Sequence, residues 1–105
     1  MNGFGFGDVE LEQMRRSAGA AADLLKVLAN RNRLLILCHL AEGEASVSEL
    51  NGKLELSQSA LSQYLAVLRE QRLVSTRRES QTIYYSLVES DAIAVIRALH
   101  DVYCS

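Results

Sequence analysis

The sequence predicts a mainly helical fold with one β-hairpin, and three observations lead to this prediction. Apolar residues recur every three or four positions along most of the chain, which is the spacing of a buried helix face. Between residues 73 and 87 this spacing gives way to two short segments rich in β-branched and aromatic residues. With 105 residues, of which 49% are hydrophobic and 23% charged, the chain has the size and balance of one globular domain.

Two helices are predicted before residue 42. Asp8 is the expected N-cap of the first helix. Its apolar stripe consists of Leu11, Met14, Ala18, Ala21, Ala22, Leu25 and Leu28. Asn30 interrupts the stripe and can cap a second helix over residues 31–41, which is apolar on almost every side and should lie at the centre of the core. Residues 1–8 are expected to form a flexible tail, so that residues 9–105 make up the single domain.

The next two predicted helices are short and are joined by a tight turn. Ser46 and Glu49 have the spacing of a capping box, which places the start of the third helix here. Ser57 can cap a fourth helix from residue 58 to about residue 71. Two short helices joined in this way form a helix-turn-helix.

The chain after residue 72 completes the predicted fold. The two β segments are expected to pair around Ser80 and Gln81 as a hairpin, or wing, and a last helix follows over residues 90–103. Four helices, two strands and a final helix in this order predict a winged helix-turn-helix.

The distribution of charge matters more here than its total. The net charge of −2 argues against a nucleic-acid partner, because phosphates are bound by positive potential. Residues 58–88, however, carry four arginines against two glutamates, whereas residues 1–57 carry six basic and eight acidic side chains. The predicted helix-turn-helix and wing are therefore locally basic.

Several other classes of protein are disfavoured. The chain has no apolar run of membrane-spanning length and no secretory signal at its start, so we expect a cytoplasmic protein without a membrane partner. No nucleophile with an adjacent base, metal motif or phosphate loop is visible. We therefore expect neither an enzyme nor a cofactor.

The outward face of the predicted fourth helix suits the major groove of DNA. Its first residues are small and uncharged, and there glutamine can pair with adenine and serine with several base edges. The outward positions are Gln58, Ser59, Ser62, Gln63, Ala66 and Arg69. A solvated polar face would explain this helix alone, but the neighbouring wing carries Arg77 and Arg78, which can hold phosphates or enter the minor groove. We predict double-stranded DNA as the partner, with Tyr64 and Gln81 as additional contacts.

A dimer is predicted for the same reason. One domain of this size covers little DNA, and specific binding usually comes from two copies that read two half-sites about one helical turn apart. The first and last predicted helices have more apolar surface than a small monomer needs. We therefore expect a symmetric homodimer, formed through these two helices, on an inverted-repeat operator.

Three segments of the chain resemble one family. LLKVLANRNRLLILCHL, LELSQSALSQYLAVLREQRLV and RRESQTIYYSL are similar to the ArsR/SmtB repressors, and the resemblance runs from about residue 10 to residue 105. Within the second segment, SQSALSQYLAVLREQRLV resembles the recognition helix of this family specifically, and the match is closer than one to helix-turn-helix proteins in general. The resemblance implies a dimer that represses a promoter until an inducer binds and lowers its affinity for DNA.

Neither of the family's familiar metal sites is complete in this chain. The arsenic-type site has two cysteines separated by one residue in the third helix, where residues 46–48 read Ser-Val-Ser. The zinc-type site needs a histidine close after Asp91, but position 93 is occupied by Ile93. Only His100 and Asp101 are left near the end of the last helix. The resemblance therefore predicts no metal site.

The two cysteines are placed as in the thiol-sensing branch of this family. In that branch, such a pair responds to reactive sulfur species or oxidants by forming a disulfide or polysulfide link, so the resemblance implies that Cys38 and Cys104 are the redox-sensing pair. Judged from the residues alone, Cys38 shares a helix face with Leu34 and can also be an inert buried thiol. Cys104 has no packing reason to be cysteine, and His100, four residues earlier, could stabilise its thiolate.

Two alternatives stay open at this point. A soft-metal sensor could use Cys38, His100 and Cys104, although three scattered ligands are a weak metal signal. A winged-helix module that binds proteins and no DNA is the other alternative. Loss of DNA binding in the variants Gln63→Ala or Arg78→Ala would distinguish DNA binding from the protein-binding module.

Overall fold

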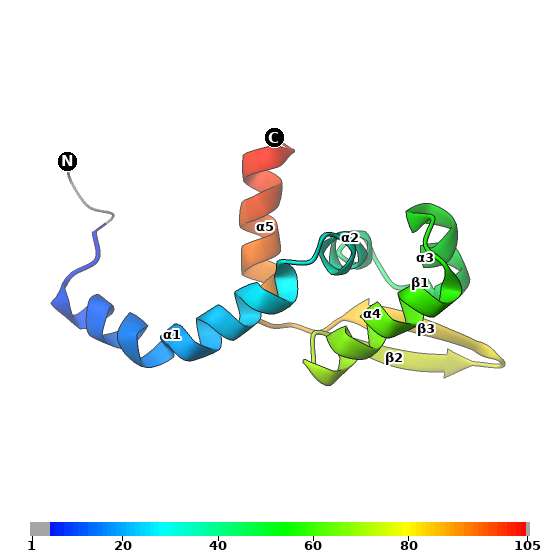
Figure 1. The fold of residues 1–105 in the computed structure, drawn as a ribbon, viewed down its shortest axis with the longest axis horizontal. Helices are drawn as coiled ribbons and strands as arrows, with labels where there is room; N and C mark the ends of the chain where they lie inside the picture. The colour runs from blue at the N-terminus through cyan, green and yellow to red at the C-terminus, as the bar shows by residue number, and fades with distance from the viewer. Residues whose placement is uncertain (1–4, 105) are drawn as a thin grey trace.

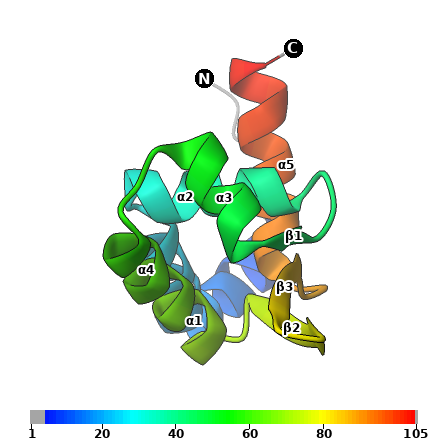
Figure 2. The same ribbon diagram turned by 90° about the vertical axis from the view of Figure 1, so that its right-hand side faces the viewer.

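The computed structural model describes residues 5–104, and within that range it confirms the winged helix-turn-helix (Figure 1). The helices are α1 (Asp8–Leu28), α2 (Arg31–Leu40), α3 (Val47–Leu54), α4 (Gln58–Glu70) and α5 (Asp91–Tyr103). The strands are β1 (Ala45–Ser46), β2 (Val74–Glu79) and β3 (Thr82–Leu87). Helices α3 and α4 form the helix-turn-helix, and β2 and β3 form the wing beside it (Figure 2).

Local side-chain caps fix three of the helix starts, as predicted. The side chain of Asn30 accepts two backbone hydrogen bonds of 3.0 Å at the start of α2. Ser46 and Glu49 form the capping box of α3 with reciprocal bonds of 2.9 and 3.1 Å. Ser57 accepts a bond of 3.1 Å from the first turn of α4. These caps satisfy N–H groups that have no partner inside the helix, so the sequence determines where each helix begins.

The start of α1 differs from the prediction. The helix begins at Asp8, and Gly7 is its N-cap residue without a side-chain cap, so the prediction of Asp8 as the cap was wrong. Asp8 instead lies in the first turn, where a carboxylate interacts favourably with the helix dipole. The predicted flexible tail of residues 1–8 therefore overlaps the helix by one residue, and residues 1–4 lie outside the described part of the chain.

The wing belongs to a three-stranded antiparallel sheet with the order β1-β3-β2. Ser80 and Gln81 connect β2 to β3 as predicted, and Ser80 takes the left-handed conformation with φ 58°. Strand β1 was not predicted, because two residues are too short to show an alternating pattern. Its pairing with β3 ties the segment between α2 and α3 to the wing.

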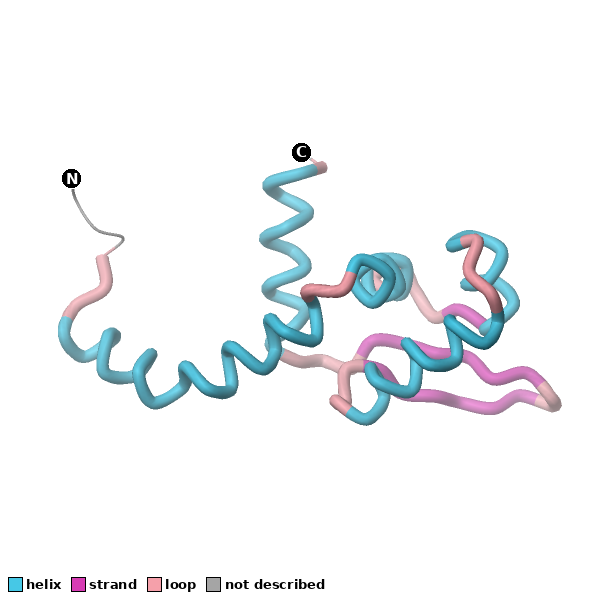
Figure 3. Tube along the Cα trace, in the orientation of Figure 1, coloured by secondary structure: helices cyan, strands magenta, loops and turns pink. Residues whose placement is uncertain are grey.

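The core lies between α2, the helix-turn-helix, the base of the wing and the start of α5. Its largest completely buried side chains are Ile36, Leu37, Leu50, Leu61, Leu65 and Leu68. Of α1, only Leu28 is buried, although that helix has 21 residues. Most of α1 therefore extends away from the core, as the tube in Figure 3 makes clear.

Candidate DNA interface and thiol pocket

Helix α4 presents the predicted reading face to solvent. Leu61, Leu65 and Leu68 are buried against the core and fix the rotation of the helix about its axis. All six predicted outward positions are exposed, and they are Gln58, Ser59, Ser62, Gln63, Ala66 and Arg69. The face is polar at the N-terminal end of the helix, which is the end that usually contacts base edges in helix-turn-helix proteins.

Tyr64 takes a different place from the other candidate residues of α4. Its side chain is partly buried and packs against the core. Its hydroxyl accepts a hydrogen bond of 3.1 Å from the side-chain amide of Asn32 in α2. Tyr64 thus joins the reading helix to α2, and its contact with the DNA backbone stays a prediction.

The two wing arginines differ sharply in their surroundings. Arg78 and Gln81 are exposed near the hairpin turn. Arg77 instead donates two hydrogen bonds, of 3.0 and 2.6 Å, to the carboxylate of Glu44 and one of 2.6 Å to Glu79. The guanidinium of Arg77 is thus paired with two carboxylates while its side chain stays half exposed, and a phosphate contact by Arg77 stays a prediction.

Aromatic contact and charge hold Arg77 in that position. Its guanidinium carbon lies 4.6 Å from the centroid of the Tyr84 ring, within the range of a cation–π contact. The hydrogen bonds from Arg77 lower the pKa of the Glu44 carboxyl, and those to Glu44 and Glu79 raise the pKa of Arg77 further. Glu44 was not identified from the sequence, since only the register of the folded sheet places it beside Arg77.

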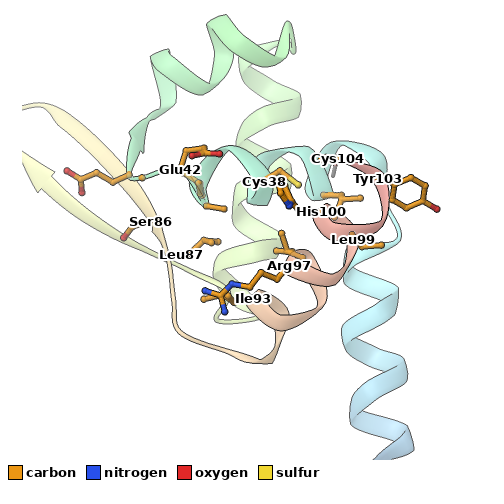
Figure 4. A pocket seen from close by; sticks show the side chains of 16 residues that line it. Cys38, Glu42, Ser86, Leu87, Ile93, Arg97, Leu99, His100, Tyr103 and Cys104 are labelled. Atoms are coloured by element: carbon orange, nitrogen blue, oxygen red, sulfur yellow. The ribbon is translucent and has the colours of Figure 1, made fainter. Parts of the chain in front are cut away.

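A pocket of about 920 Å³ lies between α2, the loop that follows it, β3 and α5. Cys38, His100 and Cys104 line the pocket together, and Figure 4 shows them on neighbouring helices. Most of its other wall residues are apolar, for instance Leu34 and Ile96. The fold thus brings together the three residues that were singled out on α2 and α5.

Cys38 is not the buried thiol expected from its apolar helix. It is exposed, as is Cys104, and both cysteines are free. The buried face of α2 consists of Ile36, Leu37 and Leu40, so Cys38 is left on the face that borders the pocket. An inert core thiol is therefore excluded for Cys38.

The environment of the pocket changes the acidity of one thiol. Partial burial raises the pKa of Cys38, and the negative charge of a Cys104 thiolate raises it further. His100 accepts a backbone hydrogen bond of 2.7 Å from Cys104, and its ring nitrogen Nδ1 lies 3.5 Å from a carboxylate oxygen of Asp101. The imidazole thus has an acidic neighbour, and His100 lines the same pocket as the two cysteines.

Two further observations concern other classes of site. Among the described residues, no group of three or more histidine, cysteine, aspartate or glutamate side chains is arranged to hold a metal ion. Within the same residues, none of the helices combines the length and the apolar character needed to cross a membrane.

A polar recognition helix beside a β-hairpin defines a winged helix-turn-helix transcriptional regulator, and comparison with known proteins identifies its family. A sequence profile for "Bacterial regulatory protein, arsR family" matches residues 30–76. The chain belongs to the ArsR family. Its relatives in this family are transcriptional regulators and not enzymes.

Close relatives extend the similarity over almost the whole chain. The transcriptional activator HlyU of Vibrio cholerae is 50% identical, over 91% of this chain and 89% of HlyU. A biofilm growth-associated repressor of Agrobacterium fabrum is 46% identical, over 94% of this chain and 85% of the repressor. The crystal structure of the transcriptional repressor BigR from Xylella fastidiosa has a TM-score of 0.84 at 42% identity, and covers 90% of this chain and 96% of BigR.

Proposed function

We propose that this protein is a homodimeric repressor that binds an inverted-repeat operator while Cys38 and Cys104 are thiols and releases it when the two are linked. The observation that carries the proposal is that both cysteines line the same pocket. Both thiols are exposed, and they belong to α2 and to the end of α5, which are distant in the sequence. A reaction that joins the two thiols would therefore change the relative position of these helices.

The dimer is supported by the shape of the chain and its exposed apolar side chains. The radius of gyration is 16.2 Å, whereas a compact chain of 100 residues has about 13 Å. Four large apolar side chains of α1 are about half exposed or more, and these are Val9, Leu11, Met14 and Leu25. At the end of α5, Val102 and Tyr103 are 72% and 80% exposed. A symmetric partner that packs on α1 and α5 would bury this surface.

The chemistry of the link needs an electron acceptor. A disulfide forms when the two thiols lose two protons and two electrons, which hydrogen peroxide accepts as it becomes two molecules of water. With an organic persulfide, one thiolate first takes the outer sulfur and releases the remaining thiol. A sulfur-chain bridge to the other cysteine then forms when the persulfidated cysteine and the other thiol lose two protons and two electrons. A second molecule of the organic persulfide accepts them and is reduced to its thiol and hydrogen sulfide.

Closing the link would pull the end of α5 toward α2. Because α5 is also part of the proposed dimer interface, this movement changes the angle between protomers and the spacing of the two α4 helices. A difference in coupling free energy of roughly 1–3 kcal/mol would lower the affinity for DNA by about 5- to 150-fold.

The test is a DNA-binding titration with reduced, peroxide-treated and persulfide-treated protein. We expect tight binding only in the reduced state, and no response in the variants Cys38→Ser and Cys104→Ser. Mass spectrometry of the treated protein distinguishes a disulfide from a sulfur-chain bridge. Equal affinity in all states, or an unchanged response in Cys38→Ser, would refute the switch.

A further inference from the structure

We propose that Arg77 is a positioning residue of the wing, and that its ion pair with Glu44 links the wing to the wall of the thiol pocket. The register of the sheet supports the first part. Tyr84 pairs with Ser46 on one side and with Arg77 on the other. The Glu44 carboxylate, two residues before Ser46, reaches Arg77 in β2, and the guanidinium lies over the Tyr84 ring.

This arrangement connects both edges of the sheet through side chains. β1 and β2 do not pair with each other, since β3 lies between them. The Glu44–Arg77 pair therefore adds a direct connection between the α2–β1 loop and the outer strand of the wing. Pairing with β3 sets the register of β2, and the Glu44–Arg77 pair adds a side-chain tie to the loop. The exposed Arg78 next to Arg77 is then the wing arginine left to contact a phosphate.

The second part rests on the position of Glu44 in the pocket. Residues 40–44 line the pocket, as do Ser86 and Leu87 of β3. Cys38 lies only a few residues before this loop, on the same helix end. When the pocket narrows or fills, its walls have to repack. Ser86 and Leu87 carry the change directly into β3, and the loop carries it to β2 through the bidentate Glu44–Arg77 pair.

The consequence is a second route from the thiols to DNA, in addition to the dimer angle. This inference rests on the proposed thiol switch for the reaction that would alter the pocket in the cell. The mechanical connection itself does not, because any modification of the thiols that alters the pocket should reach the wing. A test without DNA therefore separates the two proposals.

That test is amide hydrogen exchange of residues 74–87, measured before and after modification of the thiols. The thiols are modified in two ways, by oxidative linking and by alkylation with N-ethylmaleimide. We expect exchange in the wing to change in the native protein and in Glu42→Gln. The change in β2 should fall at least threefold in Glu44→Gln and Arg77→Gln. Glu42→Gln is the matched control, since Glu42 lies in the same loop and lines the same pocket.

The DNA titration gives a second readout, the ratio of the dissociation constants of the modified and reduced proteins. Arg78→Gln should weaken binding in both states and leave the ratio unchanged, whereas Arg77→Gln and Glu44→Gln should move the ratio toward one. Since the side chains of Glu42, Glu44, Arg77 and Arg78 are all exposed, circular dichroism should show native folding for each variant.

The outcomes are distinct. If neither modification alters exchange in the native wing, or if Glu44→Gln responds as Glu42→Gln does, the connection is overturned. If the wing responds but the native protein binds DNA equally in both states, the thiol switch fails and the Glu44–Arg77 connection stands.

Discussion

Cys38 in α2 and Cys104 at the end of α5 line the same pocket, and the charge of a Cys104 thiolate raises the pKa of Cys38. The fold therefore makes the protonation of Cys38 depend on the charge of Cys104 before any bond forms between them. Only the thiolate attacks an oxidant or a sulfane sulfur, so the raised pKa leaves a smaller fraction of Cys38 in the reactive form at neutral pH than in an unperturbed cysteine.

This coupling predicts the pH dependence of alkylation at Cys38. The rate with iodoacetamide should rise with pH, with its midpoint above that of the same cysteine in unfolded protein, because burial and the Cys104 thiolate both favour the protonated form. In Cys104→Ser the midpoint should move down, since one of the two causes is removed. Peptide mass spectrometry over a pH series measures both midpoints. An identical midpoint in Cys104→Ser would contradict the coupling.

The exposed stripe of α1 predicts that the dimer is sensitive to charge on that helix. Met14 and Leu25 are 47% and 56% exposed in the single chain. The double variant Met14→Glu/Leu25→Glu should be monomeric by sedimentation at micromolar concentration, because four carboxylates in a dimer would be brought into an apolar interface. Ile83→Glu is the control, since Ile83 is an exposed apolar residue of the wing. A dimer that persists in the double variant would place the interface elsewhere.

Burial predicts very different losses of stability for two adjacent residues of α4. Leu61 is completely buried, and Leu61→Ala should lower the free energy of unfolding by about 2–5 kcal/mol. Ser62 is exposed, and Ser62→Ala should stay within about 0.5 kcal/mol. Urea denaturation at one fixed protein concentration measures both, since the stability of a dimer depends on concentration. Comparable losses in both variants would mean that α4 is rotated relative to this structure.

The sequence predicted features that depend on residues near one another in the chain. The caps at Asn30, Ser46 and Ser57 are confirmed because each acts on a backbone group two or three residues away. The outward face of α4 followed from the positions of its leucines, since the helix period fixes which residues lie opposite them.

Features that depend on distant residues could not be predicted in this way. The pairing of Arg77 with Glu44 joins positions 33 residues apart, and nothing in either local pattern indicates it. The exposure of Cys38 was missed because a helix that is apolar on almost every side does not show which side meets the core. Strand β1 forms only because β3 lies alongside it.

The last prediction separates base reading on α4 from phosphate binding on the wing. Gln63 is exposed on the reading face, and Gln63→Ala should weaken binding to the operator by about 1–3 kcal/mol and relax the preference at one base pair of each half-site. Arg78→Gln should weaken binding to all sequences alike and reduce the slope of log K against log salt by about 1 for each protomer. Titrations of operator and unrelated DNA over a salt series measure both effects. If Gln63→Ala weakens both DNAs equally, α4 does not read bases through this residue, and if Arg78→Gln leaves the slope unchanged, the wing holds no phosphate there.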